Sequence, residues 1–193
     1  MPRSVVSKKP KALGLPKTKY DIIYCDPPWD YKGQLQHTKT TTSGGAKTHY
    51  PTAELSVMKT WAIEKIAKDD CLLFMWTSSP HLDQAIELGK AWGFSWATVA
   101  FVWEKEKPNP GFYTMSSVEM CLVFKRGKIP SPRGTRNERQ FLSEKRKKHS
   151  AKPNEIRDRI YRMFPTQKKI ELFARRKTKG WTVWGNDKSI KNT

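Results

Sequence analysis

Short apolar runs alternate with longer mixed segments along the chain, and this alternation predicts the secondary structure. Runs rich in β-branched and aromatic residues suit buried strands. The predicted strands cover residues 20–24, 71–76, 97–103, 119–124, 169–173 and 181–184. Apolar residues at helical spacing predict helices over residues 53–67, over residues 79–93, and from Pro153 onward. Strands that alternate with helices are typical of an α/β fold with a mainly parallel sheet.

Local signals indicate where these elements begin. Thr52 suits the N-cap of the first helix, because its hydroxyl can accept a hydrogen bond from a backbone N–H of the first turn. Ser79 and Pro80 suit the N-cap and the first position of the second helix. Asp69 and Asp70 predict a turn that leads into the second strand.

The first predicted strand stops abruptly at Asp26, Pro27, Pro28 and Trp29. Proline offers no N–H to a neighbouring strand, so two prolines end the strand and leave Asp26 at its carboxyl end. Ligands bind at that edge of open α/β sheets. A proline turn with an exposed aspartate is the simpler alternative, but a tryptophan on a rigid loop favours a site where its ring has a partner.

Two polar segments interrupt the pattern. Residues 30–49 contain glycines and hardly any apolar residues, and a connection of this length predicts a mobile lid next to Asp26. Residues 125–152 hold eleven basic residues against two acidic ones. Most charge runs are simply solvated surface. This one is so long and one-sided that we interpret it as a basic loop that contacts phosphates.

Composition supports a polyanionic partner. The 193 residues suit one domain, and 37 Lys and Arg against 18 Asp and Glu give a formal charge of +19. Such an excess indicates nucleic acid, and eight tryptophans add surfaces for base stacking. We expect a flexible basic arm over residues 1–19, a single domain over residues 20–187 and a short tail over residues 188–193.

The cysteines and the apolar segments exclude several classes of protein. The three cysteines are widely spaced and each lies in an apolar run, so we expect reduced core residues in a cytoplasmic protein. The sequence has no Cys or His cluster at metal-ligand spacing, no secretory signal, and no apolar stretch long enough to cross a membrane. We therefore expect neither a metal nor a membrane partner.

The loop at Asp26 resembles the catalytic motif of S-adenosylmethionine-dependent amino-methyltransferases. Its Asp-Pro-Pro-Trp form is similar to the adenine-N6 family, which includes the catalytic subunit of the eukaryotic mRNA adenosine methyltransferase and many bacterial and phage DNA enzymes. The resemblance extends over most of the chain. It includes residues 50–52, 73–76, 91–94 and 101–105, Glu119 before its strand, and residues 149–155, 170–175 and 180–186, among them the patterns SxKPxE, ELFAR and GWxxWGN.

The resemblance implies a fold, an activity and a cofactor. The fold would be α/β, with a Rossmann-like methyltransferase sheet, helices on both faces, and a permuted order in which the catalytic motif precedes the cofactor motifs. The absence of a G-x-G-x-x-G motif agrees with that order. S-adenosylmethionine would be the methyl donor. A bacterial or phage-infected cell would be the setting, in its cytoplasm.

The same resemblance assigns roles to individual residues. Asp26 and the carbonyl of Pro27 would accept the two hydrogens of the adenine amine, with Pro28 keeping the backbone rigid and Trp29 stacking on the base. Tyr50 would contribute to the same pocket. Apart from the resemblance, the charge of the basic segment and the position of the lid lead us to expect contacts of the nucleic acid with Lys32, Lys145, Arg146, Lys147 and Lys148, and we assign His149 to a substrate or cofactor gate. The cofactor would contact Asp26, Lys152, which pairs with its carboxylate, and Glu171, Arg175, Asn186 and Asp187 around its ribose and adenine.

Several alternatives stay open at this point. Methylation of adenine in DNA is the first hypothesis, because the chain is small and lacks the accessory regions of the eukaryotic RNA enzymes. An RNA adenosine-N6 methyltransferase is the second. A non-catalytic nucleic-acid-binding subunit of the same fold is the third, although such a subunit would be free to lose Asp26. Cytosine-N4 enzymes more often begin the motif with serine. The chain could also act as a homodimer.

Overall fold

The computed structural model describes residues 14–30, 52–110, 113–147 and 151–185. The strands in these ranges are β1 Tyr20–Cys25, β2 Ala67–Ser78, β3 Ser95–Asn109, β4 Ser116–Arg126, β5 Phe141–Ser143, β6 Lys169–Leu172 and β7 Thr182–Trp184. The α-helices are α1 Leu55–Lys59, α2 Leu82–Ala91 and α3 Asn154–Met163, and the 3₁₀ helices are η2 Ile63–Ile66 and η3 Ser79–His81.

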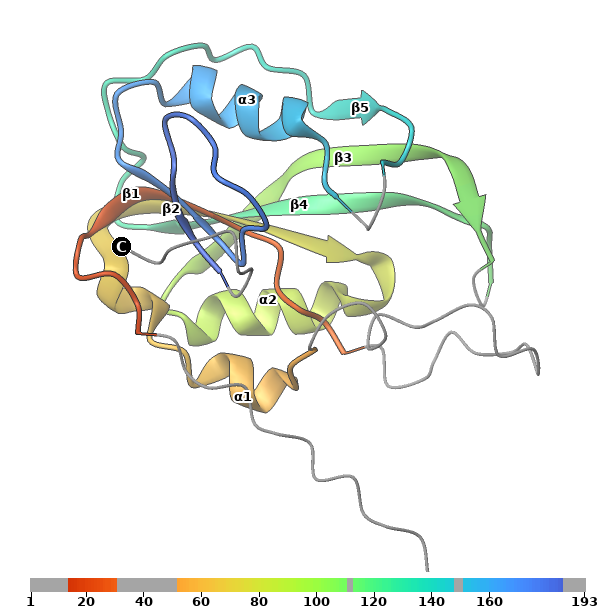
Figure 1. The fold of residues 1–193 in the computed structure, drawn as a ribbon, viewed down its shortest axis with the longest axis horizontal. Coiled ribbons are helices and arrows are strands. Elements are labelled where there is room, and N and C mark those ends of the chain that lie inside the picture. The colour runs from red at the N-terminus through yellow and green to blue at the C-terminus, as the bar shows by residue number, and fades with distance from the viewer. Residues whose placement is uncertain (1–13, 31–51, 111–112, 148–150, 186–193) are drawn as a thin grey trace, which may run out of the picture.

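Seven strands form one mixed sheet in the order β5-β3-β4-β2-β1-β6-β7 (Figure 1). Strand β4 runs antiparallel to both β2 and β3, whereas all other pairs of neighbours are parallel. A parallel pair needs a long crossover, but β3 returns directly into β4, and a short return makes the pair antiparallel. The predicted α/β fold with a mainly parallel sheet is confirmed, and β4 makes it mixed.

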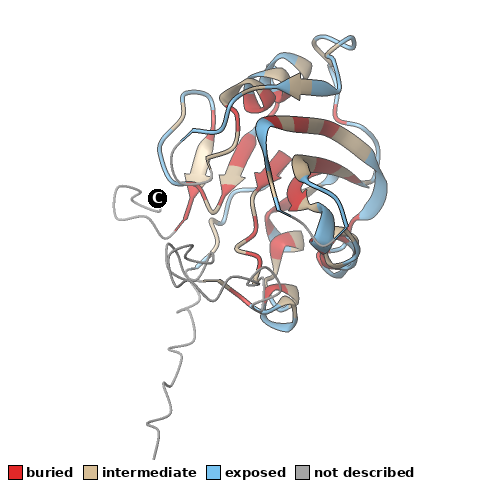
Figure 2. Cartoon of the chain, turned by 90° about the vertical axis from the view of Figure 1, so that its right-hand side faces the viewer, coloured by how far each residue is buried: buried red, intermediate tan, exposed pale blue. Residues whose placement is uncertain are grey.

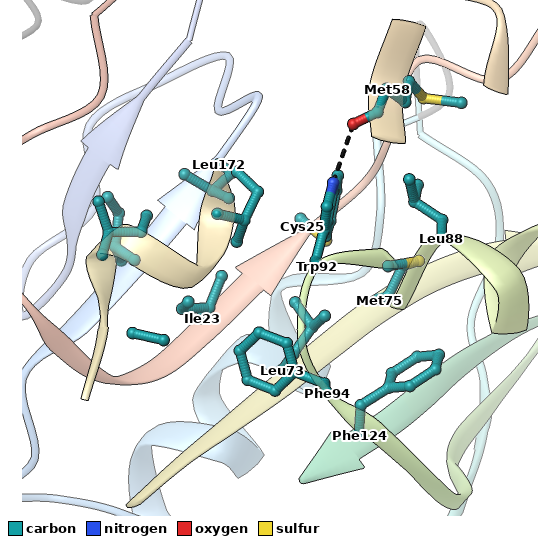
Figure 3. Close-up of a cluster of buried hydrophobic side chains, with 14 of the residues drawn as sticks. Ile23, Cys25, Met58, Leu73, Met75, Leu88, Trp92, Phe94, Phe124 and Leu172 are labelled. Atoms are coloured by element: carbon teal, nitrogen blue, oxygen red, sulfur yellow. Dashed lines mark hydrogen bonds between the residues drawn. The ribbon is translucent and has the colours of Figure 1, made fainter. Parts of the chain in front are cut away.

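Helices α1 and α2 cover one face of the sheet. Alternate residues of β1 and β2 point to this side, as the pleat of a strand requires. This core includes Ile23, Cys25, Met58, Leu73, Met75, Leu88, Trp92 and Phe124 (Figure 3). The indole Nε1 of Trp92 donates a hydrogen bond of 2.9 Å to the carbonyl of Met58, so this buried polar atom is satisfied and the two helical segments are tied together.

Helix α3 covers the opposite face, so helices lie on both sides of the sheet as predicted (Figure 1). Ile156, Ile160 and Phe164 pack there against Tyr24 and Phe74. Figure 2 shows the buried residues along the strands in the middle of the molecule and the exposed ones on the surrounding connections. In the described part of the chain, no helix is long and apolar enough to cross a membrane.

The first predicted helix is wrong in its length and its cap. Instead of one helix over residues 53–67, the chain forms α1 and η2 with a break around Trp61. The Trp61 ring lies 6.5 Å from Trp92 and 5.3 Å from Phe173, so packing of this ring outweighs continuation of the helix. Glu54, not Thr52, precedes the first turn, and its side chain makes no capping hydrogen bond.

Two other boundaries differ from the prediction. Asp69 and Asp70 lie inside β2 and not in a turn, because the pairing with β1 shifts there: Tyr20 pairs with Ala67, but Ile22 pairs with Leu72. The extra residues bulge from the strand, and Asp70 Oδ1 accepts a hydrogen bond of 2.7 Å from a backbone N–H beyond β4. The next helical segment is preceded by Ser78, one residue before the predicted cap.

The basic segment 125–152 is more ordered than a loop. Its first two residues complete β4, and β5 pairs with β3. Between them, Glu138 accepts hydrogen bonds of 2.7 and 3.0 Å from Arg162 of α3, and Gln140 donates one of 2.7 Å to the carbonyl of Val99. Its basic residues that remain exposed are Lys125, Lys128, Arg136, Arg139, Lys145, Arg146 and Lys147.

Most of the predicted arm and nearly all of the predicted lid lie outside the described residues. The end of the arm does not: Leu15 packs against the core, and Trp184 donates a hydrogen bond of 3.1 Å to the carbonyl of Gly14. Residues 14 and 15 therefore belong to the folded domain.

Candidate active site

Three carboxylates meet at one edge of the sheet. Asp26 directly follows β1, whose residue Tyr24 pairs with Glu171 on β6. Glu119 of β4 pairs with Ser78, the last residue of β2. Because β4 runs in the opposite direction, its beginning lies beside the carboxyl ends of β1, β2 and β6. This edge is where an open α/β sheet binds its ligands.

Asp26 belongs to a chain of four alternating charges, the Asp26 ion cluster, which consists of Asp26, Lys152, Glu119 and Lys105. Lys152 Nζ lies 3.1 Å from Asp26 Oδ2 and 2.8 Å from Glu119 Oε2. Lys105 Nζ lies 3.3 Å from Glu119 Oε1. The formal charges of the four side chains cancel. Lys105 is the most buried, with 6% of its side chain exposed, whereas Asp26 keeps 28% of its side chain exposed and open to a ligand.

The surroundings shift the pKa values of the two carboxylates of this cluster in opposite directions. Burial raises the pKa of Asp26, Lys152 opposes the rise, and the negative charge of Glu119 adds to it. Burial also acts on Glu119, but Lys152 and Lys105 together outweigh it and lower the pKa of Glu119. Burial disfavours a charged Lys152, yet Asp26 and Glu119 raise its pKa, so this lysine stays charged. Asp26 is thus the carboxylate of the cluster that most readily takes a proton.

Backbone and ring contacts hold the Asp-Pro-Pro-Trp loop in place. The N–H of Trp29 donates a hydrogen bond of 2.8 Å to the carbonyl of Pro27, and Ala53 donates one of 2.9 Å to the carbonyl of Pro28. Trp29 Nε1 donates one of 3.1 Å to the carbonyl of Trp76. Asp26 is therefore followed by a backbone with little freedom to move.

The ring of Trp29 is buried, with only 4% of the residue exposed. It stacks on His81 at a centroid distance of 5.6 Å, and His81 Nδ1 lies 3.0 Å from Ser78 Oγ. Burial lowers the pKa of His81, so its ring favours the neutral form. In this position the indole anchors the loop to η3. Stacking on an adenine would require it to leave the core.

Replacing Trp29 by Ala tests whether its ring holds the loop in the core or stacks on an adenine. We expect the free energy of unfolding to fall by about 3 to 5 kcal/mol, because a large buried ring is lost. Trp29→Phe should cost less, since it keeps a ring and loses the hydrogen bond to Trp76. Urea denaturation measures both. An unchanged unfolding free energy with a raised KM for nucleic acid would favour the stacking role instead.

Glu171 lies beside the cluster and is held by Arg157 of α3. Arg157 Nη1 donates to Glu171 Oε2 at 2.5 Å and to Thr178 Oγ1 at 2.6 Å, and its Nη2 donates to Asn154 Oδ1 at 3.0 Å. Burial raises the pKa of Glu171. Arg175 is exposed near this edge, and its charge acts to lower the pKa of Asp26.

The other residues predicted for the site divide into two groups. Lys145, Arg146 and Lys147 are exposed on the segment that leads to Lys152; Arg146 Nη1 donates a hydrogen bond of 3.0 Å to Asn109 Oδ1, and Lys147 lies 2.8 Å from Glu144. The remaining predictions lie outside the described residues. They concern Lys32, Tyr50, Lys148, His149, Asn186 and Asp187.

Sequence reasoning missed two members of the cluster and gave Lys152 a different partner. Glu119 and Lys105 carry charges at the ends of apolar strands, and a charge that is buried needs a counter-charge. A charged residue at the end of an apolar strand was therefore the signal in the sequence that could have identified both residues. Lys152 was predicted to pair with the cofactor carboxylate, and here it pairs with Asp26 and Glu119. Among the described residues, no group of three His, Cys, Asp or Glu side chains could hold a metal ion.

Comparison with known proteins identifies the family. The profile of the MT-A70 family matches residues 20–187. This range includes the three carboxylates Asp26, Glu119 and Glu171, together with Lys152. The chain belongs to the MT-A70 family. Its predicted resemblance to the adenine-N6 methyltransferases is thereby confirmed.

Members of this family with curated names differ greatly in length. The chain is 48% identical over 183 residues to the Type II methyltransferase M.MunI of a Mycoplasma species, covering 89% of this chain and 78% of that protein. It is 26% identical to the N(6)-adenosine-methyltransferase subunit METTL3 of Danio rerio, covering 87% of this chain but 28% of that protein. For the N(6)-adenine-specific methyltransferase METTL4 of Mus musculus the identity is also 26%, over 37% of that protein. The chain thus spans only a minor part of these two eukaryotic relatives.

Proposed function

We propose that this protein transfers a methyl group from S-adenosylmethionine to the N6 amine of adenine in DNA. The position of Asp26 carries the proposal: it is a partly exposed carboxylate at the ligand-binding edge of the sheet, held by a charged lysine and followed by a fixed proline backbone. The 48% identity to a Type II methyltransferase over most of both chains supports the activity. The DNA substrate is supported by that relative and by the charge of +19.

We infer a Rossmann-like methyltransferase sheet with a permuted order of motifs. Asp26 precedes Lys152 and Glu171 by more than a hundred positions in the sequence. The pairing of β1 with β6 nevertheless brings Asp26 and Glu171 to the same edge. This arrangement supports a catalytic loop from the first part of the chain and cofactor contacts from the last.

The side chains at this edge fit S-adenosylmethionine. When bound, it supplies a methyl group carried by a positively charged sulfur, together with an amino-acid end and ribose hydroxyls. Asp26 and Glu119 suit its cationic groups, and Lys152 suits its carboxylate. Arg157 holds Oε2 of Glu171, which leaves Oε1 to accept a hydrogen bond from a hydroxyl. Arg175, Asn186 and Asp187 complete the proposed cofactor set.

Asp26 and Pro27 can prepare the amine for methylation. The nitrogen lone pair is delocalised into the adenine ring, so acceptors that pull both N–H bonds out of the ring plane make the nitrogen more nucleophilic. Asp26 accepts one hydrogen. The carbonyl of Pro27, which already accepts a bond from Trp29, has a second lone pair for the other. The nitrogen would form the new N–C bond as the bond between the methyl carbon and sulfur breaks, with that electron pair left on the sulfur. The proton that the nitrogen then loses would pass to Asp26 or to water. The raised pKa of Asp26 suits that last step.

An alternative is a nucleic-acid-binding subunit that does not catalyse. Isothermal titration of the purified chain with S-adenosylmethionine separates the two: we expect saturable binding to one site. Absence of binding, both alone and with DNA present, would favour the non-catalytic subunit.

The basic residues that precede Lys152 in the sequence are proposed to bind the DNA backbone. We expect replacement of Lys145, Arg146, Lys147 and Lys148 by Gln to weaken binding to all DNA sequences. The slope of log affinity against log salt should become shallower by about 0.9 for each phosphate that the protein no longer neutralises. Filter binding at several salt concentrations measures this.

A matched control uses lysines at the other edge of the sheet. Lys19 precedes β1, Lys128 follows β4 and Lys168 precedes β6, and all three are exposed. Their replacement by Gln removes three positive charges far from Asp26, against four in the basic segment, so the salt slope should change little. If the two variants changed the salt slope by the same amount for each charge removed, the basic segment would be merely solvated surface.

A further inference from the structure

The connection between β3 and β4 presents two large apolar side chains to solvent. Tyr113 is 99% exposed and Met115 is 59% exposed, and we call residues 113–115 the β3–β4 tip. Among the large apolar side chains of the described residues, these two are the most exposed, ahead of Phe141 at 57% and Trp96 at 46%. Removing apolar side chains from water is favourable, so two of them close together in the sequence indicate a surface with a partner.

The tip lies at the active-site edge of the sheet. It immediately precedes β4, and Glu119 of β4 belongs to the Asp26 ion cluster. Tyr113 precedes Glu119 by six positions, which limits the reach of the tip to about 20 Å beyond the cluster. Figure 1 shows β3 and β4 extending together past the end of the neighbouring strands. The tip is therefore within reach of a polymer whose base enters the site.

The base of the tip is bent and stiff. Between Glu104 and Asn109, β3 has three more residues than the facing part of β4, so the strand bulges. Glu106 has a φ of 59°, a costly value for a residue other than glycine, and its N–H donates a hydrogen bond of 2.8 Å to Glu104 Oε1. Pro108 and Pro110 restrict the chain further. Bulges next to active sites re-aim the chain that follows them.

The flanks of the tip are basic. Lys107 lies on β3 six positions before Tyr113 and is exposed, as is the acidic Glu106 beside it. Arg146 of the basic segment is bound to Asn109 at the last residue of β3, so Lys145 and Lys147 are placed beside the same strand. Cationic flanks around an exposed aromatic tip complement a nucleic acid, with phosphates on the outside and stacked bases within.

We propose that the β3–β4 tip is a wedge that enters the base stack of double-stranded DNA and fills the space left by the adenine that swings out to Asp26. This inference rests on the proposed function and adds that the substrate is a duplex. Extruding a base costs a few kcal/mol of stacking and pairing. Apolar side chains inserted between base steps offset this cost in other proteins that distort DNA. Tyr113 and Met115 have the chemistry and the exposure for that role.

The test compares methylation of native and heat-denatured genomic DNA that lacks N6-methyladenine. For the variant Tyr113→Ala with Met115→Ala, we expect the rate on native DNA to fall about tenfold or more. The rate on denatured DNA should stay within about twofold, because an unstacked base needs no wedge. Tyr113→Phe keeps an aromatic ring and should retain most of the activity on native DNA. Ile129→Ala serves as a control, since Ile129 is 48% exposed beyond the opposite end of β4.

Each other result would overturn the wedge. Equal losses on both forms of DNA would assign the tip a general role in folding or binding. Unchanged rates on both forms, accompanied by a change in self-association on gel filtration, would make the tip a contact between copies of the chain; unchanged rates without that change would leave it no role. Activity of the unsubstituted protein on denatured DNA alone would contradict a duplex substrate and keep the proposed function. Inactivity on both forms would overturn the proposed function as well.

Discussion

Replacing Asp26 by Asn is expected to reduce methyl transfer by about a thousandfold or more, in the range of losses when a positioned acid–base group is removed. Asn keeps one oxygen that can accept a hydrogen bond, but it has no negative charge and cannot take the proton from the methylated amine. Transfer of labelled methyl groups to DNA measures the rate. Titration with S-adenosylmethionine should show an affinity within a few fold of the original, because Lys152 and Glu171 remain.

The same variant should not be less stable. The folded protein raises the pKa of Asp26, so the ionised carboxylate costs free energy on folding, and the neutral Asn removes that cost. Urea denaturation at pH 7 should give an equal or higher unfolding free energy. Asp158→Asn, an exposed substitution on α3, is the matched control and should leave both rate and stability unchanged. Full activity of Asp26→Asn would refute the mechanism.

Replacing Lys152 by Met is expected to reduce both stability and activity. Lys152 is the cation shared by Asp26 and Glu119, so its loss leaves two carboxylates facing each other, with Lys105 on Glu119 as the one lysine that remains in the cluster. Breaking a partly buried ion pair from one side costs about 3 kcal/mol. Methyl transfer should fall as well, since an unpaired Asp26 takes up a proton more easily, and the neutral acid accepts hydrogen bonds more weakly and cannot take the proton from the methylated amine.

The loss of stability caused by Lys152→Met should become smaller as the pH falls. In the unsubstituted protein the pKa of Glu119 is lowered, so its stabilising contribution is present at neutral pH and is lost as the pH falls through that pKa. Without Lys152, burial should raise the pKa values of Asp26 and Glu119. Both carboxylates then take up protons as the pH falls, which removes the repulsion between them and stabilises the folded variant. The difference in unfolding free energy between the two proteins should therefore shrink from pH 7 to pH 5.

A matched substitution controls for the loss of a lysine as such. Lys147→Met removes an exposed lysine that pairs with Glu144, and such surface pairs contribute little. It should change the unfolding free energy by less than about 1 kcal/mol at either pH. A loss as small for Lys152→Met would mean that the ion cluster does not hold the site together.

The sequence was sufficient for the strand that carries the site but not for the contacts around it. Tyr20 to Tyr24 form a buried strand because they are mostly apolar and β-branched or aromatic, and the prolines that follow Asp26 prevent the strand from continuing. Glu119 and Lys105 come from other strands. Only the antiparallel placement of β4 between β2 and β3 brings them to Asp26, and that placement depends on strand order, which local pattern does not encode.

Tertiary packing also explains where the local predictions failed. The apolar residues from 53 to 67 have helical spacing, but the ring of Trp61 packs on Trp92 and breaks the helix. Trp29 follows a proline loop and was predicted to have a partner for its ring, but the sequence did not indicate that this partner would be His81. Trp92 and His81 are distant in the sequence from the rings that they contact, so local propensity and spacing cannot predict these contacts.

The most direct test of the proposed function is mass spectrometry of nucleosides. The purified protein is incubated with S-adenosylmethionine and with either unmethylated genomic DNA or an unmodified RNA, and each polymer is then digested. We predict N6-methyldeoxyadenosine from the DNA, far less N6-methyladenosine from the RNA, no N4-methyldeoxycytidine, and none of these products with Asp26→Asn. Methylated adenosine from RNA alone, methylated cytosine, or no methylated nucleoside at all would contradict the account.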